Sequence, residues 1–304
     1  MLNSPRSFSL QRPDIMKIGN VKIDGKVQAA IQKEDRVIPL STFKGFHEKY
    51  GNVITDDIMH NPKMFQAISE LAKQDLKSDQ KYEGQISFAS VVMRPQKIIC
   101  VGLNYRSHVE ETRDKLPESP VLFSKYSNSL AGSGDSIAIP HETKQLDYEG
   151  ELGIVIGKKG NNIKESDAFD YVFGYFIGND VSARDLQFRT SQWLLGKTGD
   201  GFYPCGPFIT TGDEIKDPQK LSIRTKLNNE IRQDSNTSYM IFSCAYLISY
   251  ISRFMTLYPG DIISTGTPEG VILGMPEDKR VWIKSGDRVT IEIEGLGRLE
   301  NVFS

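Results

Sequence analysis

The feature that most constrains how this chain can fold is a series of short, largely apolar runs after Pro95, each about as long as a β-strand. Valine, isoleucine and aromatic residues, which favour strands, are frequent in them. ELGIVIG is almost wholly apolar, as expected of a strand covered on both faces. The runs are KIICVG (97–102), PVLFSK (120–125), ELGIVIG (151–157), VFGYFIGNDV (172–181), GDIISTG (260–266) and RVTIEIEG (288–295). We therefore expect a β-rich α+β domain.

Turn signals stand between the strand-like runs. Gly-Asp pairs begin or precede three of them, in GSGDSIAIP, YPGDIISTG and KSGDRVTIEIEG, and this pair is typical of tight turns. In KLNNEIRQ (226–233), Asn228 and Asn229 separate two alternating runs, which predicts a hairpin. The strands are thus expected to return on one another.

Helical patterns are fewer, and they do not alternate regularly with the strands. Apolar spacing predicts a helix over 243–255, and further helices are expected over 104–115 and 182–193. Neither GxGxxG nor GxxxxGK[ST] occurs, so nucleotide-binding α/β folds lose support.

The chain changes character near residue 93. The preceding part has a β-like stretch over 17–40, a helical stretch over 62–79 and no cluster of chemically useful side chains. We expect two domains, a small N-terminal α+β region over 1–93 and a catalytic domain over 94–304.

Composition excludes several classes of function. The net charge of −2 and the isoelectric point near 6.2 give no electrostatic case for nucleic acid or a membrane as partner. No apolar run approaches the roughly 20 residues that span a bilayer. Cys100, Cys205 and Cys244 are widely spaced, against a disulfide framework. MLNSPRSFSLQRPD lacks the apolar core of a secretory signal, so we expect a cytoplasmic protein.

Two glutamates stand at the start of the most apolar run, in QLDYEGELGIVIG. Glu149 and Glu151 are two positions apart and share one face of a strand, where like charges repel unless positive charge lies between them. Asp180 is a third acid at the end of an apolar run. Three carboxylates suit a hard divalent cation such as Mg²⁺, with Mn²⁺ or Ca²⁺ also acceptable. The alternative is that each acid is a solvated strand end or turn cap.

A histidine and a glutamate share a predicted helical face. His108 and Glu111 are three positions apart, and a carboxylate beside an imidazole fixes its tautomer and raises its basicity. The pair is therefore a candidate general base, and a surface ion pair is the alternative. His47, His60 and His141 have no comparable neighbour.

Cationic and polar side chains supply candidates for binding an anion. Arg184 and Gln187 share a face if their segment is helical, and Lys197 and Thr267 lie in WLLGKTGD and STGTPEGV. Such groups suit a substrate carboxylate and developing negative charge, although most basic residues are simply solvated.

Taken together, these stretches resemble the fumarylacetoacetate hydrolase family. The motifs that carry the resemblance, in order, are VGLNYRSH, PVLFSK, LDYEGELGIVIGK, VFGYFIGNDVSARDLQ and GDIISTGTPEGV, and together they cover roughly residues 95 to 300. The resemblance implies a mixed β-roll and a homodimer. It also implies that Glu149, Glu151 and Asp180 hold Mg²⁺ or Mn²⁺, which chelates a 2-oxo acid substrate.

The resemblance implies roles for the other candidates. His108 and Glu111 match the family's dyad, carried on a lid, and Lys197 matches the lysine near the reacting centre. The positions that match those holding the substrate's oxo-acid end are Arg184, Gln187 and Thr267.

The implied reaction is cleavage of a C–C bond through a metal-stabilised pyruvate enolate. In an acylpyruvate, His108 would activate the attacking water, whereas oxaloacetate decarboxylation needs no water. The alternatives are a 2-hydroxyhepta-2,4-diene-1,7-dioate-type isomerase and a non-catalytic regulatory protein that binds a 2-oxo acid.

Overall fold

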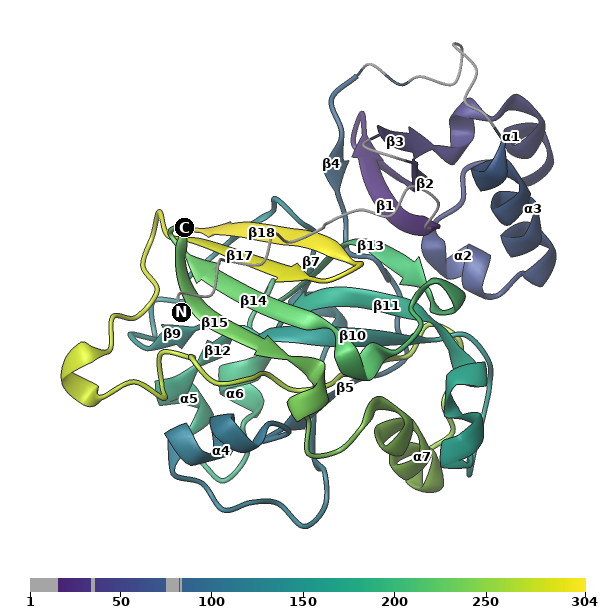
Figure 1. Cartoon of the computed structure of the whole chain (residues 1–304). Coiled ribbons are helices and arrows are strands. Elements are labelled where there is room, and N and C mark those ends of the chain that lie inside the picture. Colours follow the sequence, from purple (N-terminus) through teal and green to yellow (C-terminus); the bar gives the residue numbers. More distant parts are fainter. Residues whose placement is uncertain (1–15, 34–35, 75–81, 83) are drawn as a thin grey trace, which may run out of the picture.

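The computed structural model describes residues 16–33, 36–74, 82 and 84–304, and strands dominate it (Figure 1). The strands are β1 (Lys17–Ile23), β2 (Lys26–Lys33), β3 (Arg36–Pro39), β4 (Ser87–Phe88), β5 (Ile98–Gly102), β6 (Val121–Lys125), β7 (Leu130–Ala131), β8 (Ser136–Ile137), β9 (Leu146–Asp147), β10 (Gly150–Ile156), β11 (Val172–Asn179), β12 (Ser182–Ala183), β13 (Tyr203–Thr211), β14 (Ser222–Leu227), β15 (Glu230–Asn236), β16 (Ile262–Ser264), β17 (Arg288–Ile293) and β18 (Gly297–Phe303). The helices are α1 (Lys44–Tyr50), α2 (Thr55–Met59), α3 (Pro62–Lys73), α4 (Arg106–Thr112), α5 (Arg184–Gln187), α6 (Leu194–Lys197) and α7 (Cys244–Phe254).

These strands form three sheets. The largest has 11 strands and follows the order β3-β2-β1-β13-β11-β10-β16-β5-β6, with β4 beside β1 and β7 beside β13. The order β15-β14-β17-β18-β8 forms a second sheet, and β12 pairs with β9. Most pairs are antiparallel, but β5 with β16, β7 with β13 and β8 with β18 are parallel. The expected β-rich α+β class with mixed strands is confirmed.

Strand β10 lies in the interior of the largest sheet, and this explains its apolar sequence. It hydrogen-bonds to β11 on one side and β16 on the other, and all seven of its residues are buried. In the antiparallel pair, Gly150 at the start of β10 lies opposite Asn179 at the end of β11. The residues just before β10 and just after β11 therefore meet at the same end of these two strands.

The three Gly-Asp pairs form the same turn three times. Gly134, Gly260 and Gly286 have positive φ of 86°, 86° and 89°, a conformation that glycine adopts without steric cost. Each following aspartate accepts a hydrogen bond through Oδ2 from the backbone N–H three residues earlier. The repeated motif thus fixes three tight returns, as predicted.

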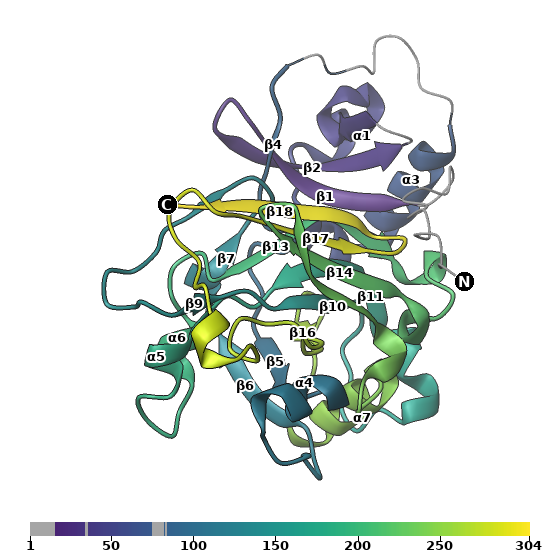
Figure 2. The same ribbon diagram turned by 60° about the vertical axis from the view of Figure 1, so that its left-hand side comes forward.

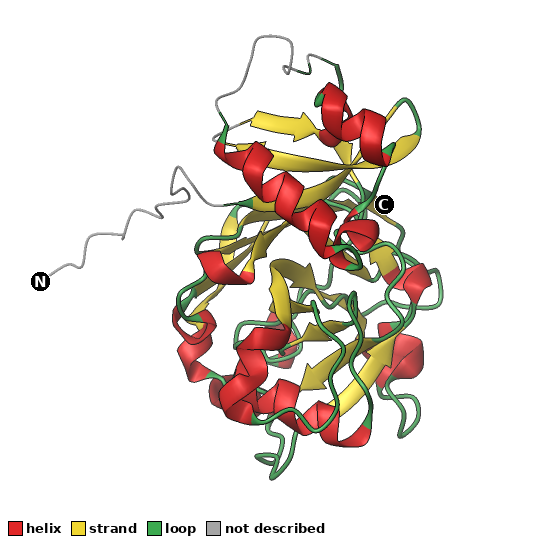
Figure 3. Cartoon of the chain, turned by 90° about the vertical axis from the view of Figure 1, so that its right-hand side faces the viewer, coloured by secondary structure: helices red, strands yellow, loops and turns green. Residues whose placement is uncertain are grey.

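The N-terminal part carries its own layer of helices. Strands β1–β3 lie at one end of the large sheet, and α1 and α3 lie beside them (Figures 1 and 3). Apolar residues of β1, β2, α2 and α3 form a core cluster that includes Ile18, Ile31 and Ile68. Strand β1 also pairs with β13, so the sheet is continuous across the predicted boundary at residue 93, which stays a prediction. The predicted helix over 62–79 is confirmed as α3, and its residues 75–79 lie outside the described residues.

Two of the remaining local predictions hold and two need correction. Helix α7 and the β14–β15 hairpin are present, the latter with positive φ at Asn228 and Asn229. The helix expected over 104–115 is shorter, as α4. A single helix over 182–193 is wrong, because β12 pairs with β9 and α5 ends at Gln187. Thr190 then accepts the backbone N–H of Gln192 through its hydroxyl, a local bond that competes with helix.

Two global expectations concern membranes and cysteines. Among the described residues, no helix has the length and apolar character needed to cross a bilayer. Cys100, Cys205 and Cys244 are all buried and unpaired.

The close approach of β10 to β11 gives a stability prediction. A Cβ at Gly153 would come within 2.3 Å of the ring of Phe176, which is fully buried. Gly153→Ala should therefore lower the free energy of unfolding by about 1–3 kcal/mol, as overpacking does in cores. Denaturant titration measures this. Gly45→Ala is the matched control, because a Cβ there meets no atom within 4 Å. Equal stability of the two variants would contradict the packing described.

Candidate active site

The three predicted acids meet at the sheet edge where β10 begins and β11 ends. Glu149 precedes β10, Asp180 follows β11, and the backbone N–H of Asp180 donates to the carbonyl of Glu149 at 2.9 Å. One carboxylate oxygen from each of Glu149, Glu151 and Asp180 lies within 4.8 Å of the others. The exposed fractions are 5%, 1% and 0%, so the solvated alternative does not describe these acids.

Basic side chains lie between the like charges. Lys197 Nζ lies 2.7 Å from Glu149 Oε2 and 2.9 Å from Asp180 Oδ2, so its ammonium bridges the two acids. Lys125 Nζ contacts the other oxygen of Asp180 at 2.7 Å, and Arg184 Nη2 contacts Glu149 Oε1 at 2.7 Å. Two of the three acids are thus balanced by cations of the chain itself.

Glu151 differs from the other two acids. Among the described residues it forms no ion pair, and its Oε2 accepts hydrogen bonds from the Ser264 hydroxyl and from the Gly266 N–H, the latter at 3.0 Å. Burial raises the pKa of the Glu151 carboxyl well above its usual range, and the charges of Asp180 and Glu149 raise it further.

The balance of charge shifts the pKa values of the neighbours as well. Burial opposes the charged form of Glu149, but Lys197 and Arg184 outweigh it and lower the pKa of that carboxyl. Burial likewise opposes the charge of Lys197, but Asp180 and Glu149 raise the pKa of its ammonium. For Lys125, burial dominates over Asp180 and lowers the pKa.

This donor set fits a divalent cation. Four buried carboxyl groups (Asp147, Glu149, Glu151 and Asp180) face three buried cations (Lys125, Arg184 and Lys197), and among the described residues Glu151 has no cationic partner. Oxygen-only ligands suit hard cations such as Mg²⁺ or Mn²⁺. Glu149, Glu151 and Asp180 are the residues that would hold it.

The predicted dyad is formed on α4. His108 Nδ1 lies 2.8 Å from Glu111 Oε1, and Glu111 Oε2 accepts the Gly270 N–H at 2.9 Å. Because a carboxylate only accepts, Nδ1 carries the hydrogen and Nε2 is left as the basic nitrogen. The Gly270 bond anchors the dyad to the loop after β16.

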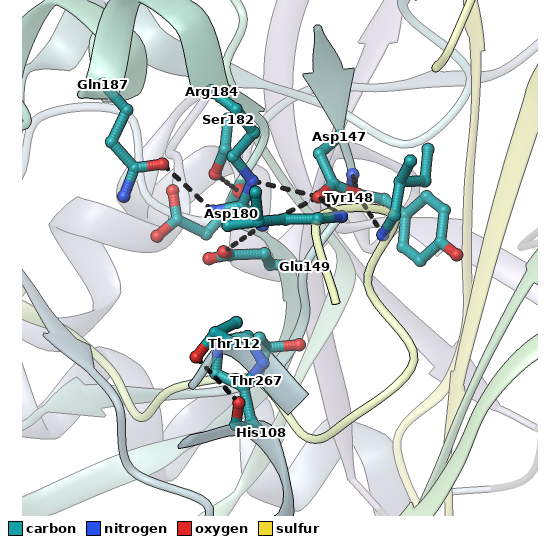
Figure 4. A network of polar contacts seen from close by, with 12 residues as sticks. His108, Thr112, Asp147, Tyr148, Glu149, Asp180, Ser182, Arg184, Gln187 and Thr267 are labelled. Atoms are coloured by element: carbon teal, nitrogen blue, oxygen red, sulfur yellow. Dashed lines mark hydrogen bonds and ion pairs between the residues drawn. The ribbon is translucent and has the colours of Figure 1, made fainter. Parts of the chain in front are cut away.

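One cavity joins the dyad to the acids. His108 lies across it from Glu149, Arg184 and Gln187 (Figure 4). Helices α4, α5 and α6, which carry several of these residues, lie on the same side of the molecule in both views (Figures 1 and 2). The polar lining includes His108, Glu149, Glu151, Arg184, Gln187, Lys197 and Thr267, and the apolar lining includes Phe123, Phe188, Trp193 and Leu273.

The three residues predicted to bind substrate line this cavity, but they differ in their contacts. Arg184 is paired with Glu149 and Asp147, and its Nη1 donates to Gln187 Oε1 at 3.0 Å. The Thr267 hydroxyl donates to the Gly150 carbonyl and accepts from Gln233 Nε2. Their substrate-binding roles stay predictions.

Sequence reasoning missed Lys125, Asp147 and Ser264. Lys125 is a charged residue at the end of a largely apolar run, PVLFSK, the same signal that pointed to Asp180. Asp147 continues the alternation of Glu149 and Glu151 by two positions, so strand periodicity could have found it. No comparable signal marks Ser264, because its contact with Glu151 depends on the pairing of β10 with β16.

A buried acidic cluster that faces a histidine–glutamate pair across a cavity defines an enzyme that acts on a small molecule. The family described as Fumarylacetoacetate (FAA) hydrolase C-terminal matches residues 97–304. The chain belongs to the fumarylacetoacetate hydrolase family, and the resemblance inferred from its motifs is confirmed.

Similar proteins point to related activities. The chain is 50% identical over 218 residues to oxaloacetate tautomerase Fahd2a, mitochondrial, of Rattus norvegicus, a match that covers 71% of this chain and 69% of the relative. It is 45% identical over 243 residues to oxaloacetate tautomerase fahd2, mitochondrial, of Xenopus laevis, covering 79% and 76%. The solved fumarylacetoacetate hydrolase from Exiguobacterium antarcticum superimposes with a TM-score of 0.80 at 33% identity, covering 95% of this chain and 99% of the other. The expected fold of the family is thereby confirmed.

The expected cytoplasmic location is wrong. Both relatives above are named mitochondrial. The expectation rested on the missing apolar core of a secretory signal, and mitochondrial targeting segments have no such core, because they are amphipathic and rich in arginine and serine. The stretch on which the expectation rested, residues 1–14, lies outside the described residues.

Substituting Glu151 tests the metal site. Glu151→Gln keeps the shape and can still accept from Ser264 and Gly266, but it removes the carboxylate oxygen that would bind the metal. We expect Mn²⁺ affinity to fall at least about 100-fold, since even outer partners of metal ligands are worth about 10- to 100-fold. Isothermal titration calorimetry measures this, and metal-free Glu151→Gln should melt no lower than the unsubstituted protein. The exposed Glu142→Gln is the control; unchanged Mn²⁺ affinity in Glu151→Gln would remove Glu151 from the ligand set.

Proposed function

We propose that the chain catalyses the keto–enol interconversion of oxaloacetate or a closely related 2-oxo acid, with a divalent cation held by Glu149, Glu151 and Asp180. The observation that carries the proposal is that His108, held by Glu111, lines the same cavity as the acidic cluster. The two relatives named as oxaloacetate tautomerases support the choice of reaction and substrate.

The reaction moves one proton between the enol oxygen on C2 and the carbon C3. In the proposal, Nε2 of His108 takes the proton from the enol oxygen and passes it to C3, or in the reverse direction takes it from C3 and returns it to the oxygen, while Glu111 keeps the tautomer fixed. The Lys197 ammonium offers a positive charge to the oxygen on C2 as the enolate forms. When bound, the cation supplies Lewis acidity that stabilises the same oxygen.

Cleavage of a C–C bond is the second candidate, and the dyad itself favours it. The same Nε2 could accept the proton of a water that attacks an acyl carbonyl, and the solved structure above is named a hydrolase. Decarboxylation of oxaloacetate needs the enolate stabilisation alone. The diene isomerase and the non-catalytic 2-oxo acid binder remain alternatives within the same site.

We also propose that the chain forms a homodimer and that its metal is Mg²⁺ or Mn²⁺. We further propose that its two domains divide at residue 93. Light scattering on the purified full chain would give the assembly state. Titration with each metal would give the preference.

Turnover of freshly dissolved enol-oxaloacetate tests the main proposal. We expect the Mg²⁺- or Mn²⁺-loaded protein to accelerate loss of the enol ultraviolet absorbance beyond the metal alone, and EDTA to abolish the effect. His108→Asn should lower kcat by about 10²- to 10⁴-fold, the usual contribution of a general base. Asparagine can keep the bond to Glu111 through its amide nitrogen but lacks Nε2.

A matched histidine provides the control. His60→Asn changes an imidazole just after α2 that contacts the Asp56 carbonyl and does not line the cavity, and it should leave the rate unchanged. A coupled pyruvate assay with oxaloacetate and acylpyruvates runs in parallel. Pyruvate release without faster tautomerisation would indicate that the function is C–C bond cleavage. If neither activity were detected, the remaining alternative would be a non-catalytic protein that binds a 2-oxo acid.

A further inference from the structure

A buried aspartate outside the acidic cluster organises the anion-binding side of the cavity. Asp147 is fully buried, and its two oxygens accept from backbone and side-chain donors on three segments. Oδ1 accepts the N–H groups of Tyr148 and Ile272, both at 2.9 Å. Oδ2 accepts the Leu273 N–H and the Arg184 Nε–H, both at 3.0 Å, and forms an ion pair with Arg184 Nη2 at 2.9 Å. The carboxylate is saturated with donors, so it has no capacity left for a ligand.

Arg184 is correspondingly committed to the protein. Nε donates to Asp147 and Nη1 donates to Gln187, while Nη2 forms ion pairs with Asp147 Oδ2 at 2.9 Å and Glu149 Oε1 at 2.7 Å. Burial disfavours its charge, but Glu149 and Asp147 raise the pKa of Arg184. All three nitrogens of Arg184 thus face groups of the protein, so Arg184 is poorly placed to bind a carboxylate in the bidentate manner that makes arginine a strong anion ligand.

The contact between Arg184 and Gln187 determines which end of the amide faces the cavity. A guanidinium cannot accept a hydrogen bond, so the Gln187 oxygen must be the atom that faces Nη1, as Figure 4 shows. The amide nitrogen then points away from Arg184, and Gln187 lines the cavity. Its two N–H groups are available to an anionic ligand.

We propose that Asp147 is a positioning residue that acts through Arg184 to present the Gln187 amide nitrogen as a hydrogen-bond donor to the substrate's oxo-acid end. The same carboxylate holds Leu273, which lines the cavity, so one side chain fixes a polar and an apolar wall. The inference rests on the proposed function in taking the ligand to be a 2-oxo acid. Its test uses binding and requires no turnover.

Asparagine at position 147 cannot reproduce this arrangement. Both oxygens of Asp147 face N–H groups, so the NH2 of an asparagine would face a donor in either orientation. A buried donor facing a donor is costly. Arg184 would lose its main partner and could pair with Glu149 alone, which frees Gln187 to turn.

The experiment measures binding of oxalate, a planar dianion with the shape of a pyruvate enolate, to the Mn²⁺-loaded protein by isothermal titration calorimetry. Gln187→Met and Asp147→Asn should each weaken oxalate binding by roughly 10- to 100-fold, the usual worth of a hydrogen bond to a charged group. The Mn²⁺ affinity of Gln187→Met should stay within about threefold. The double variant should bind oxalate no more weakly than Asp147→Asn, since residues acting through one contact are not additive.

The control is another buried, saturated aspartate. Asp261 is fully buried, pairs with Lys97 and accepts the Tyr258 N–H, so Asp261→Asn should lower the melting temperature and leave oxalate affinity unchanged. Unchanged oxalate affinity in Gln187→Met would overturn the inference even if Asp147→Asn failed to fold, and additive losses in the double variant would overturn it where Asp147→Asn folds. If the unsubstituted Mn²⁺-loaded protein bound no oxalate, the proposed 2-oxo acid site itself would fall with it.

Discussion

The structure around the active site depends on the compensation of buried negative charge. Breaking a buried ion pair by removing one partner costs about 3–5 kcal/mol, and here four carboxylates share three cations in one edge of the sheet. Arg184 and Lys197 each join two acids, which makes the segments that carry them part of the site. The short helices α5 and α6 thus owe their positions to charge as well as to packing.

The unbalanced charge links this network to catalysis. Glu151 is held only by neutral donors, and its neighbours raise its pKa, so the cluster as a whole favours one more positive charge. The cavity in front of it brings together His108, the Lys197 ammonium and the Gln187 amide. A cation and an enolate are complementary to this surface, and that complementarity relates the proposed tautomerase to the hydrolases of the family.

Much of the fold followed from local patterns. The apolar runs became strands, and the Gly-Asp pairs became three equivalent turns. The prediction of a helix over 182–193 was wrong because only one helical turn, α5, forms there. After it, the Thr190 hydroxyl accepts the backbone N–H of Gln192. The expectation of a cytoplasmic location was wrong because the criterion applied to secretion alone.

The sequence by itself determined that Glu149 and Glu151 share a face, that His108 can reach Glu111, and that Arg184 can reach Gln187, because strand and helix periods fix such neighbours. Only the tertiary structure decided that Lys125 contacts Asp180, that Asp147 holds Arg184, and that His108, Glu149 and Arg184 border one cavity. The first two contacts join residues that are 55 and 37 positions apart. Their partners are chosen by sheet register and by the need to balance buried charge, which no short stretch of sequence contains.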